Sequence, residues 1–199
     1  MRVISIFICV FLCGSLSEAC AEDITPSFSQ KLDIQVRYDN RSNRPSREQY
    51  RLRYYPSLAL TSTWSVNSFI VTGDDFSSSH NTFGSDTTDY LYARRLYLRH
   101  ETNAGKTELG IIPTYKGRVS STGLSKDGWI TGIRHVRKLQ NNTALEIVVG
   151  QLANAEASEA FNVGEEDEYF EIEYSAKMGG RHSYEASFER MLNGTFARA

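Results

Sequence analysis

Strict alternation of apolar and polar side chains is the feature that most limits how this chain can fold. Residues 32–38 read LDIQVRY, so leucine, isoleucine, valine and tyrosine fall on one side, and aspartate, glutamine and arginine on the other. A period of two is typical of a β-strand with two unlike faces. In a secreted β-sandwich the apolar face would point into a protein core, whereas in a membrane barrel it would face lipid.

The alternation continues along the chain in segments rich in aromatic and β-branched residues, which favour strands. We predict nine of them, at residues 31–38, 49–60, 64–73, 90–101, 106–116, 128–139, 143–152, 167–178 and 181–192. No segment has a convincing helical period. Most run to about ten residues, the length that a tilted strand needs to cross a bilayer, whereas strands of globular proteins are nearer five or six. The fold class is therefore all-β.

The lengths of the connections between strands distinguish a β-sandwich from a barrel. Long polar connections at 39–48, 74–89, 117–127 and 153–166 alternate with short ones at 61–63, 102–105, 140–142 and 179–180. Outer-membrane barrels have this plan, with short turns on the periplasmic side and longer loops outside. We therefore predict an antiparallel, up-and-down transmembrane β-barrel.

The first residues predict export. Residues 1–21 combine Arg2, an apolar run and an Ala-Cys-Ala cleavage site, which together indicate a secretory signal peptide. Lipid attachment at Cys20 is the alternative. Because all three cysteines lie in this segment, cleavage would leave a chain without cysteine. We expect residues 22–199 to form one barrel domain in the bacterial outer membrane.

Charged residues at alternate strand positions are the candidate pore lining. Burying such a charge away from water and without a partner costs much free energy, but the cost is small where the strand face lines water. The predicted lining is a basic wall on early strands and an acidic wall on late strands: Arg37, Arg51, Arg53, Arg95 and Arg99, opposed by Glu171, Glu173, Glu185 and Glu189. Opposed walls would set a transverse field across a pore and favour small polar or charged solutes. The alternative is that these charges pair with one another inside a filled barrel.

Two further patterns concern strand faces. Tyr38, Tyr50, Trp64, Tyr90 and Trp129 stand near strand ends, where aromatic girdles meet the lipid interfaces, although aromatic residues are common in any strand. The segment 128–139 breaks the alternation. A bulge or an apolar residue facing the pore would each explain it.

Catalytic and cofactor chemistry finds no support in the sequence. No nucleophile–base set and no phosphate-binding loop is visible, and the four histidines lack metal-ligand spacing. The net charge of −2 gives no reason to propose nucleic acid binding. We expect no enzyme activity, no cofactor and no metal.

Residues 51–84 contain an arginine-rich strand, a short turn, and a strand that ends in TGD before a Ser/Asn-rich loop. This segment resembles the opening hairpin of Gram-negative outer-membrane porins. Residues 90–111 resemble their next hairpin, and the alginate-export type of barrel has a similar plan. The resemblance implies passive diffusion of small hydrophilic solutes. Ile111 stands where the family often has an arginine that can face the pore, which puts a constriction there in doubt.

The strand count raises the question of closure. Nine strands is an odd number, whereas single-chain bacterial barrels have an even one, and we expect residues 193–199 in an outer loop. The chain would then be the N-terminal part of a longer barrel, a truncated one, or a half that needs a partner such as a second copy; a strand within 22–30 would make ten. Besides outer-membrane lipid and solutes as partners, two other functions stay open: a structural or adhesive filled barrel, and a soluble exported β-sandwich that binds a ligand.

Overall fold

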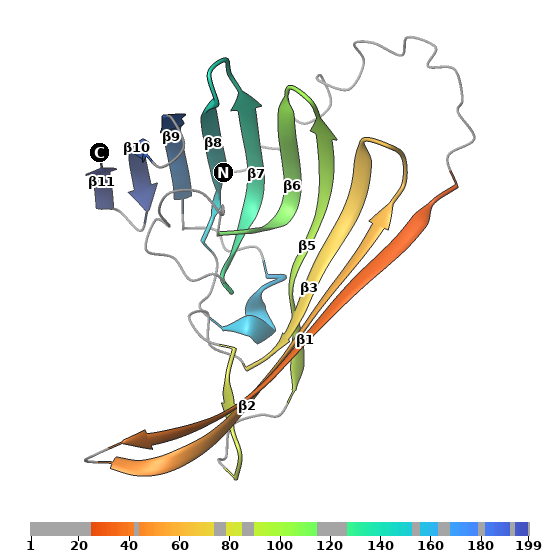
Figure 1. Cartoon of the computed structure of the whole chain (residues 1–199), viewed down its shortest axis with the longest axis vertical. Helices are drawn as coiled ribbons and strands as arrows, with labels where there is room; N and C mark the ends of the chain where they lie inside the picture. Colours follow the sequence, from red (N-terminus) through yellow and green to blue (C-terminus); the bar gives the residue numbers. More distant parts are fainter. Residues whose placement is uncertain are drawn as a thin grey trace, which may run out of the picture.

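The computed structural model describes residues 25–41, 44–73, 79–84, 90–114, 127–152, 156–162, 168–178, 182–191 and 194–198. The expected signal peptide, with the cysteines, lies outside the described residues. The strands are β1 (Ser27–Arg41), β2 (Arg44–Ala59), β3 (Trp64–Thr72), β4 (Asn81–Thr82), β5 (Leu91–Thr102), β6 (Gly105–Pro113), β7 (Trp129–Lys138), β8 (Thr143–Gln151), β9 (Glu168–Met178), β10 (His182–Met191) and β11 (Gly194–Arg198). One 3₁₀ turn, η1 (Ala157–Glu159), precedes β9 (Figure 1).

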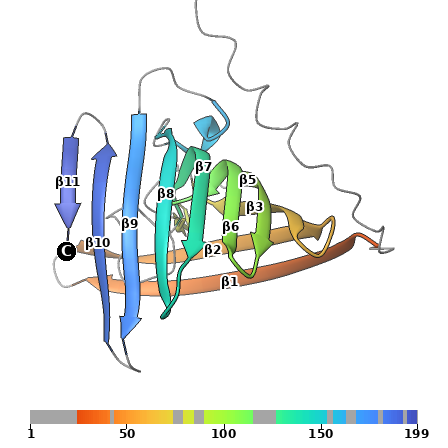
Figure 2. The same cartoon turned by 90° about the horizontal axis from the view of Figure 1, so that it is seen from above.

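All the strands belong to one antiparallel sheet. Ten of them pair in the order β1-β2-β3-β5-β6-β7-β8-β9-β10-β11, and the short β4 pairs with β2. Each strand on this path therefore lies beside the next one along the chain, which is the up-and-down arrangement expected. The path is open in the described residues, with β1 and β11 as its end strands. Figures 1 and 2 show a curved, strongly twisted sheet in which β1 and β2 run obliquely to β8–β11.

Each of the nine predicted segments falls on a strand, but two connections differ from the prediction. The expected loop at 39–48 is largely strand, because β1 continues to Arg41 and β2 begins at Arg44. Asp39 and Arg47 face each other across this hairpin and form an ion pair with N and O 3.0 Å apart. Residues 194–198, expected in an outer loop, form β11 and pair with β10. Polar composition alone did not distinguish a hairpin extension from a loop.

The two faces of the sheet have opposite exposure. On β8 and β9 the alternate residues Ala144, Glu146, Val148, Tyr169, Glu171, Glu173 and Ser175 are buried, and they define what we call the inner face. Their neighbours Val149, Phe170 and Ile172 are exposed on the outer face. At β1 both faces are open: Ile34 is 64% and Val36 70% exposed on the outer face, and Gln35 and Arg37 are exposed on the inner face. The polar side of LDIQVRY thus lies on the inner face and its apolar side is in the open.

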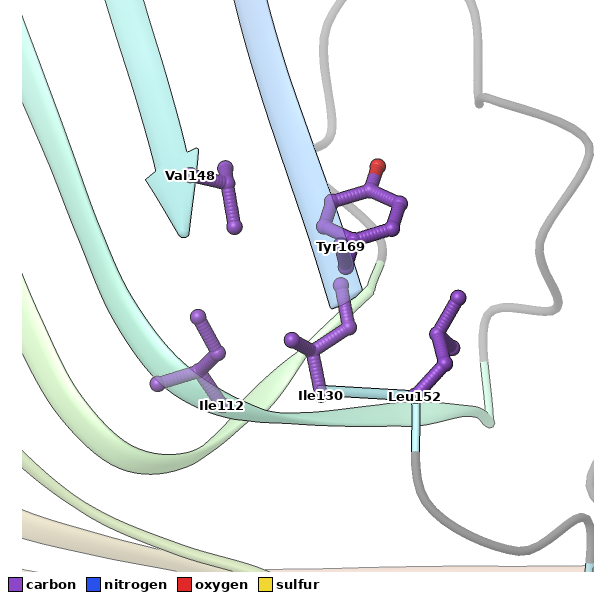
Figure 3. Packing of buried hydrophobic residues seen from close by; sticks show 5 residues of the cluster. All are labelled: Ile112, Ile130, Val148, Leu152 and Tyr169. Atoms are coloured by element: carbon purple, nitrogen blue, oxygen red, sulfur yellow. The ribbon is translucent and has the colours of Figure 1, made fainter. Parts of the chain in front are cut away.

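Apolar side chains also occur on the inner face, at the end of the sheet opposite the short turns. Ile112, Ile130, Val148, Leu152 and Tyr169 pack together inside the curve of the sheet (Figure 3). Ile112 and Ile130 are a cross-strand pair, and β7 pairs with both neighbours without a register shift. Inward-facing apolar residues, and not a bulge, therefore explain the irregular pattern of segment 128–139.

A second cluster joins η1 to the ends of β6 and β7. Ala157 and Ala160 pack with Ile111 and Trp129, and Trp129 has no exposed surface. The expectation that Trp129 belongs to an aromatic girdle is therefore wrong, because the residues beside η1 cover its indole. Trp64 and Tyr90, in contrast, are exposed. Among the described residues no helix is long and apolar enough to cross a membrane.

Candidate functional site

The inner face collects the charged strand residues into one continuous surface. Arginines dominate on β1–β5 and glutamates on β9 and β10, and both kinds point to the same side of the sheet. The structure therefore brings the predicted basic and acidic residues onto one face, at opposite ends of the strand order. Between the two groups lie β6, β7 and β8.

Four of the five predicted arginines make short polar contacts in the described part of the chain, and for Arg51 the structure gives only its burial. Arg37 donates from Nε to Oε1 of Gln49 at 3.1 Å, and Arg51 is half-buried. Arg53 forms an ion pair with Asp127 at 2.9 Å and lies 4.0 Å from Asp33.

The remaining two lie further along the sheet on β5. Arg95 is buried, donates from Nε to the carbonyl of Gly128 at 2.9 Å and stacks its guanidinium 4.6 Å from the ring centre of Phe69. Arg99 donates from Nε to Oε1 of Glu108 at 2.9 Å. Each of these contacts fixes a cation against the inner face.

The predicted glutamates lie close together on neighbouring strands. Glu171, Glu173 and Glu189 are each 1% exposed, whereas Glu185 is half-buried. Glu171 pairs with Glu189 in the β9–β10 register, and Tyr169 donates its hydroxyl to Oε2 of Glu171 at 2.8 Å. Carboxylates directly opposite each other repel, and this register concentrates acidic groups at this end of the inner face.

Sequence reasoning missed the charges that join the two ends. Glu108 on β6 is fully buried and accepts from Arg99, from Lys106 at 3.3 Å and from Arg134 at 2.9 Å. Arg134 also pairs with Glu146 through Nε at 3.0 Å. We call Arg99, Glu108, Arg134 and Glu146 the ionic ladder, since they lie on four consecutive strands of the sheet. The alternation of KTELG and the arginine within segment 128–139 could have predicted that Glu108 and Arg134 lie on the charged face. The apolar residues next to Arg134 made that pattern hard to recognise.

A bulge brought a further arginine inward. On β5, Tyr92 and Arg95 pair with Val71 and Phe69, so three steps on β5 match two on β3. The extra residue is Arg94, which is fully buried, donates to the carbonyl of Gly73 and lies with its guanidinium 5.6 Å from the Trp129 ring. Strict alternation would have placed Arg94 and Arg95 on opposite faces.

Loop residues close onto the inner face beside this bulge. Asp127 accepts from Oγ of Ser79 at 2.7 Å and from Arg53, and it is nearly buried. Burial alone would raise the pKa of Asp127, but the hydrogen bond from Ser79 and the charge of Arg53 lower it below its ordinary 3.8. Burial, and then the charges of Arg51 and Arg37, lower the pKa of His80 below 6.5. This region therefore keeps its carboxylate charged and disfavours a further cation.

Comparison with known proteins adds nothing to this geometry: the chain matches no protein-family model and no curated protein. Among the described residues, no three histidine, cysteine or acidic side chains lie close enough together to hold a metal ion. The inner face offers instead many fixed charges of both signs along one surface. Such a surface can attract, orient or pass charged and polar solutes.

Proposed function

We propose that this chain forms the wall of an outer-membrane β-barrel channel through which small hydrophilic solutes diffuse passively. The observation that carries the proposal is the polarity of the sheet: from β5 to β10 most charged side chains of the inner face are buried, and the aliphatic side chains of the outer face are exposed. A water-soluble protein rarely exposes contiguous apolar patches larger than a few hundred Å². In a bilayer the same face meets hydrocarbon, while the inner face keeps its charges away from lipid.

Strand length and pairing agree with this proposal. The strands on the main path from β1 to β10 have 9 to 16 residues, and about 9–11 suffice to span the hydrocarbon layer. Every inner strand of the path pairs with both neighbours over at least part of its length, and the backbone groups paired in this way need no water. In the channel that we propose, the edges of β1 and β11 pair as well, with each other or with a second copy of the chain, because an open edge in lipid is very unfavourable.

The inner side chains give the channel its selectivity in this proposal. Basic groups on the early strands and acidic groups on the late strands would set a field across the lumen, as the sequence predicts. Polar and charged solutes of small size would orient in this field and pass. No covalent chemistry and no cofactor is part of the proposed function.

A filled structural barrel is the second candidate, and one observation favours it. Ile112, Ile130, Val148, Leu152 and Tyr169 occupy inner-face positions and pack together. Small barrels of about eight strands are filled by their own side chains. A closed barrel of this width with such a cluster would conduct nothing and would serve as an anchor or adhesin.

The test is planar-bilayer conductance of the protein purified and folded in detergent. Discrete current steps support the channel, and a folded, heat-modifiable protein without steps supports the filled barrel. A chain that extracts without detergent as a soluble protein contradicts both.

Ion selectivity supplies a sharper readout. Glu185→Gln removes an inner-face charge, and Glu48→Gln removes a charge from the exposed face of β2. We expect only Glu185→Gln to shift the zero-current potential in a salt gradient, in the direction of weaker cation preference. Equal shifts in both variants would contradict the assignment of the lumen to the inner face.

A further inference from the structure

A cavity of about 600 Å³ lies on the inner face, next to the short turns of the sheet. It is lined by residues of β5 to β9, including Asn142 and Thr143 at the turn between β7 and β8. Figure 1 shows this turn and the β5–β6 turn at the same end of the sheet. Pockets that hold small organic ligands commonly measure about 300–1,000 Å³, so the cavity is large enough for one.

Positive charge dominates its lining. Five basic side chains take part, namely Arg99, Lys106, Arg134, Lys138 and Lys177, against the two carboxylates of Glu101 and Glu146. Glu108 lies beneath them and contacts three of the five. With Glu108 included, the five basic and three acidic side chains give a net formal charge of +2, which favours binding of an anion.

The cations divide into a paired floor and an open rim. Arg134, at the floor, is buried between Glu108 and Glu146. Lys138 and Lys177, at the rim, are exposed, and in the described part of the chain neither ammonium has a carboxylate partner. Ala144 lies between their strands, paired with Lys138 on one side and with Ser175 on the other. These short side chains leave space between the two lysines.

The lining also has an apolar part. Val136 and Leu139 contribute to the same cavity beside Lys138. A ligand that satisfies all of these groups has two anionic ends for the basic side chains and a short hydrocarbon segment for the valine and leucine. Glu173 faces Glu146 in the β8–β9 register and so repels such a ligand from the deeper side of the inner face.

We propose that this cavity binds small dicarboxylates, with Lys138 and Lys177 holding one carboxylate at the rim and Arg99 and Lys106 facing the other. The inference goes beyond the proposed function, because binding needs the folded sheet and not an open pore. In a channel the cavity would concentrate dicarboxylates at the mouth on the side of the short turns. Charge-assisted hydrogen bonds from lysine and arginine to carboxylate are the strongest that these groups make.

The experiment is calorimetric titration of the full chain, folded in detergent at low salt, with succinate as the probe. Succinamide tests whether charge is needed, and inorganic phosphate tests whether the carbon chain is needed. The rim variant is Lys138→Gln combined with Lys177→Gln. Its matched control is Lys31→Gln combined with Arg137→Gln, which removes the same charge from positions outside the cavity.

We expect succinate to bind at least tenfold more tightly than succinamide or phosphate, and the rim variant to weaken it at least fivefold while the control changes it less than twofold. Undetectable succinate binding to the folded protein, equal binding of succinamide or phosphate, or equal loss in the two variants would overturn the inference. Binding without conductance would retain this site and reject the channel, and conductance without binding would do the reverse.

Discussion

Replacing Glu108 by glutamine tests whether the inner face is held together by its charges. The carboxylate of Glu108 is fully buried and contacts Arg99, Lys106 and Arg134 at 2.8, 3.3 and 2.9 Å. Glutamine keeps the shape but replaces an anion by a neutral amide whose NH₂ group faces other donors. Arg134, which is 1% exposed, would then keep Glu146 as its ion-pair partner from the ladder while the positive charge around it rises.

The size of the effect follows from this burial. Removing one partner from a buried ion pair costs about 3–5 kcal/mol, because the other charge stays buried without compensation. An exposed pair contributes about 0–1 kcal/mol. Glu101 supplies the matched control, since it is exposed and pairs in register with Lys106 at the end of the same hairpin.

The assay is urea unfolding of protein folded in detergent or lipid, followed by circular dichroism. With a slope of about 2 kcal/mol per molar urea, a loss of 3–5 kcal/mol lowers the midpoint by about 1.5–2.5 M. We expect this shift for Glu108→Gln and a shift below about 0.5 M for Glu101→Gln. Indistinguishable midpoints for the two variants would refute the reasoning, because they would mean that water solvates the ladder despite its burial.

Three other predictions follow from the structure. The pKa of Asp127 is lower in the folded protein than its ordinary 3.8, so its carboxylate stabilises the fold above that pH, and this effect is lost as the pH falls through the folded pKa. Urea unfolding should therefore show that the stability difference between wild type and Asp127→Asn shrinks below about pH 4. Gly132→Ala should cost about 1–3 kcal/mol in thermal unfolding, since its Cβ would lie 2.2 Å from the carbonyl oxygen of Val149, and an unchanged melting temperature would contradict the close approach of β7 and β8. Leu109→Arg, on the outer face of β6, should cost about 2–4 kcal/mol in vesicles, whereas Leu60→Arg, exposed beside the turn after β2, should cost about 0–1 kcal/mol. Equal small costs would show that the outer face does not meet lipid.

The period of two in the sequence was enough to predict the strands and the two faces of the sheet. It predicted that Leu32 and Ile34 share one face and that Asp33 and Arg37 share the other, because successive side chains of a strand point to opposite sides. It could not predict Arg94, because a bulge has no signature in the alternation of LYARRLYL. It could not predict the burial of Trp129 either, since the covering residues of η1 lie almost thirty positions further along the chain.

The sequence predicted which residues belong to the candidate site, but not which of them contact one another. Arg53 and Arg95 are on the face expected of them, yet their partners Asp127 and Gly128 come from a distant part of the chain. Which carboxylate meets which guanidinium depends on strand register, and one residue of slip changes every partner. Whether these residues line a pore stays a prediction until conductance is measured.

The bulge at Arg94 also bears on how this sheet tolerates insertion and deletion. Arg94 is the one residue by which β5 outnumbers its partner between Tyr92 and Arg95, so its removal would restore regular pairing and leave the remaining side chains on their present faces. Removal of Leu98 instead would turn the rest of β5 over and send Arg99 outward. Along this strand, length can therefore change by one residue at a single position without inverting the polarity of the sheet.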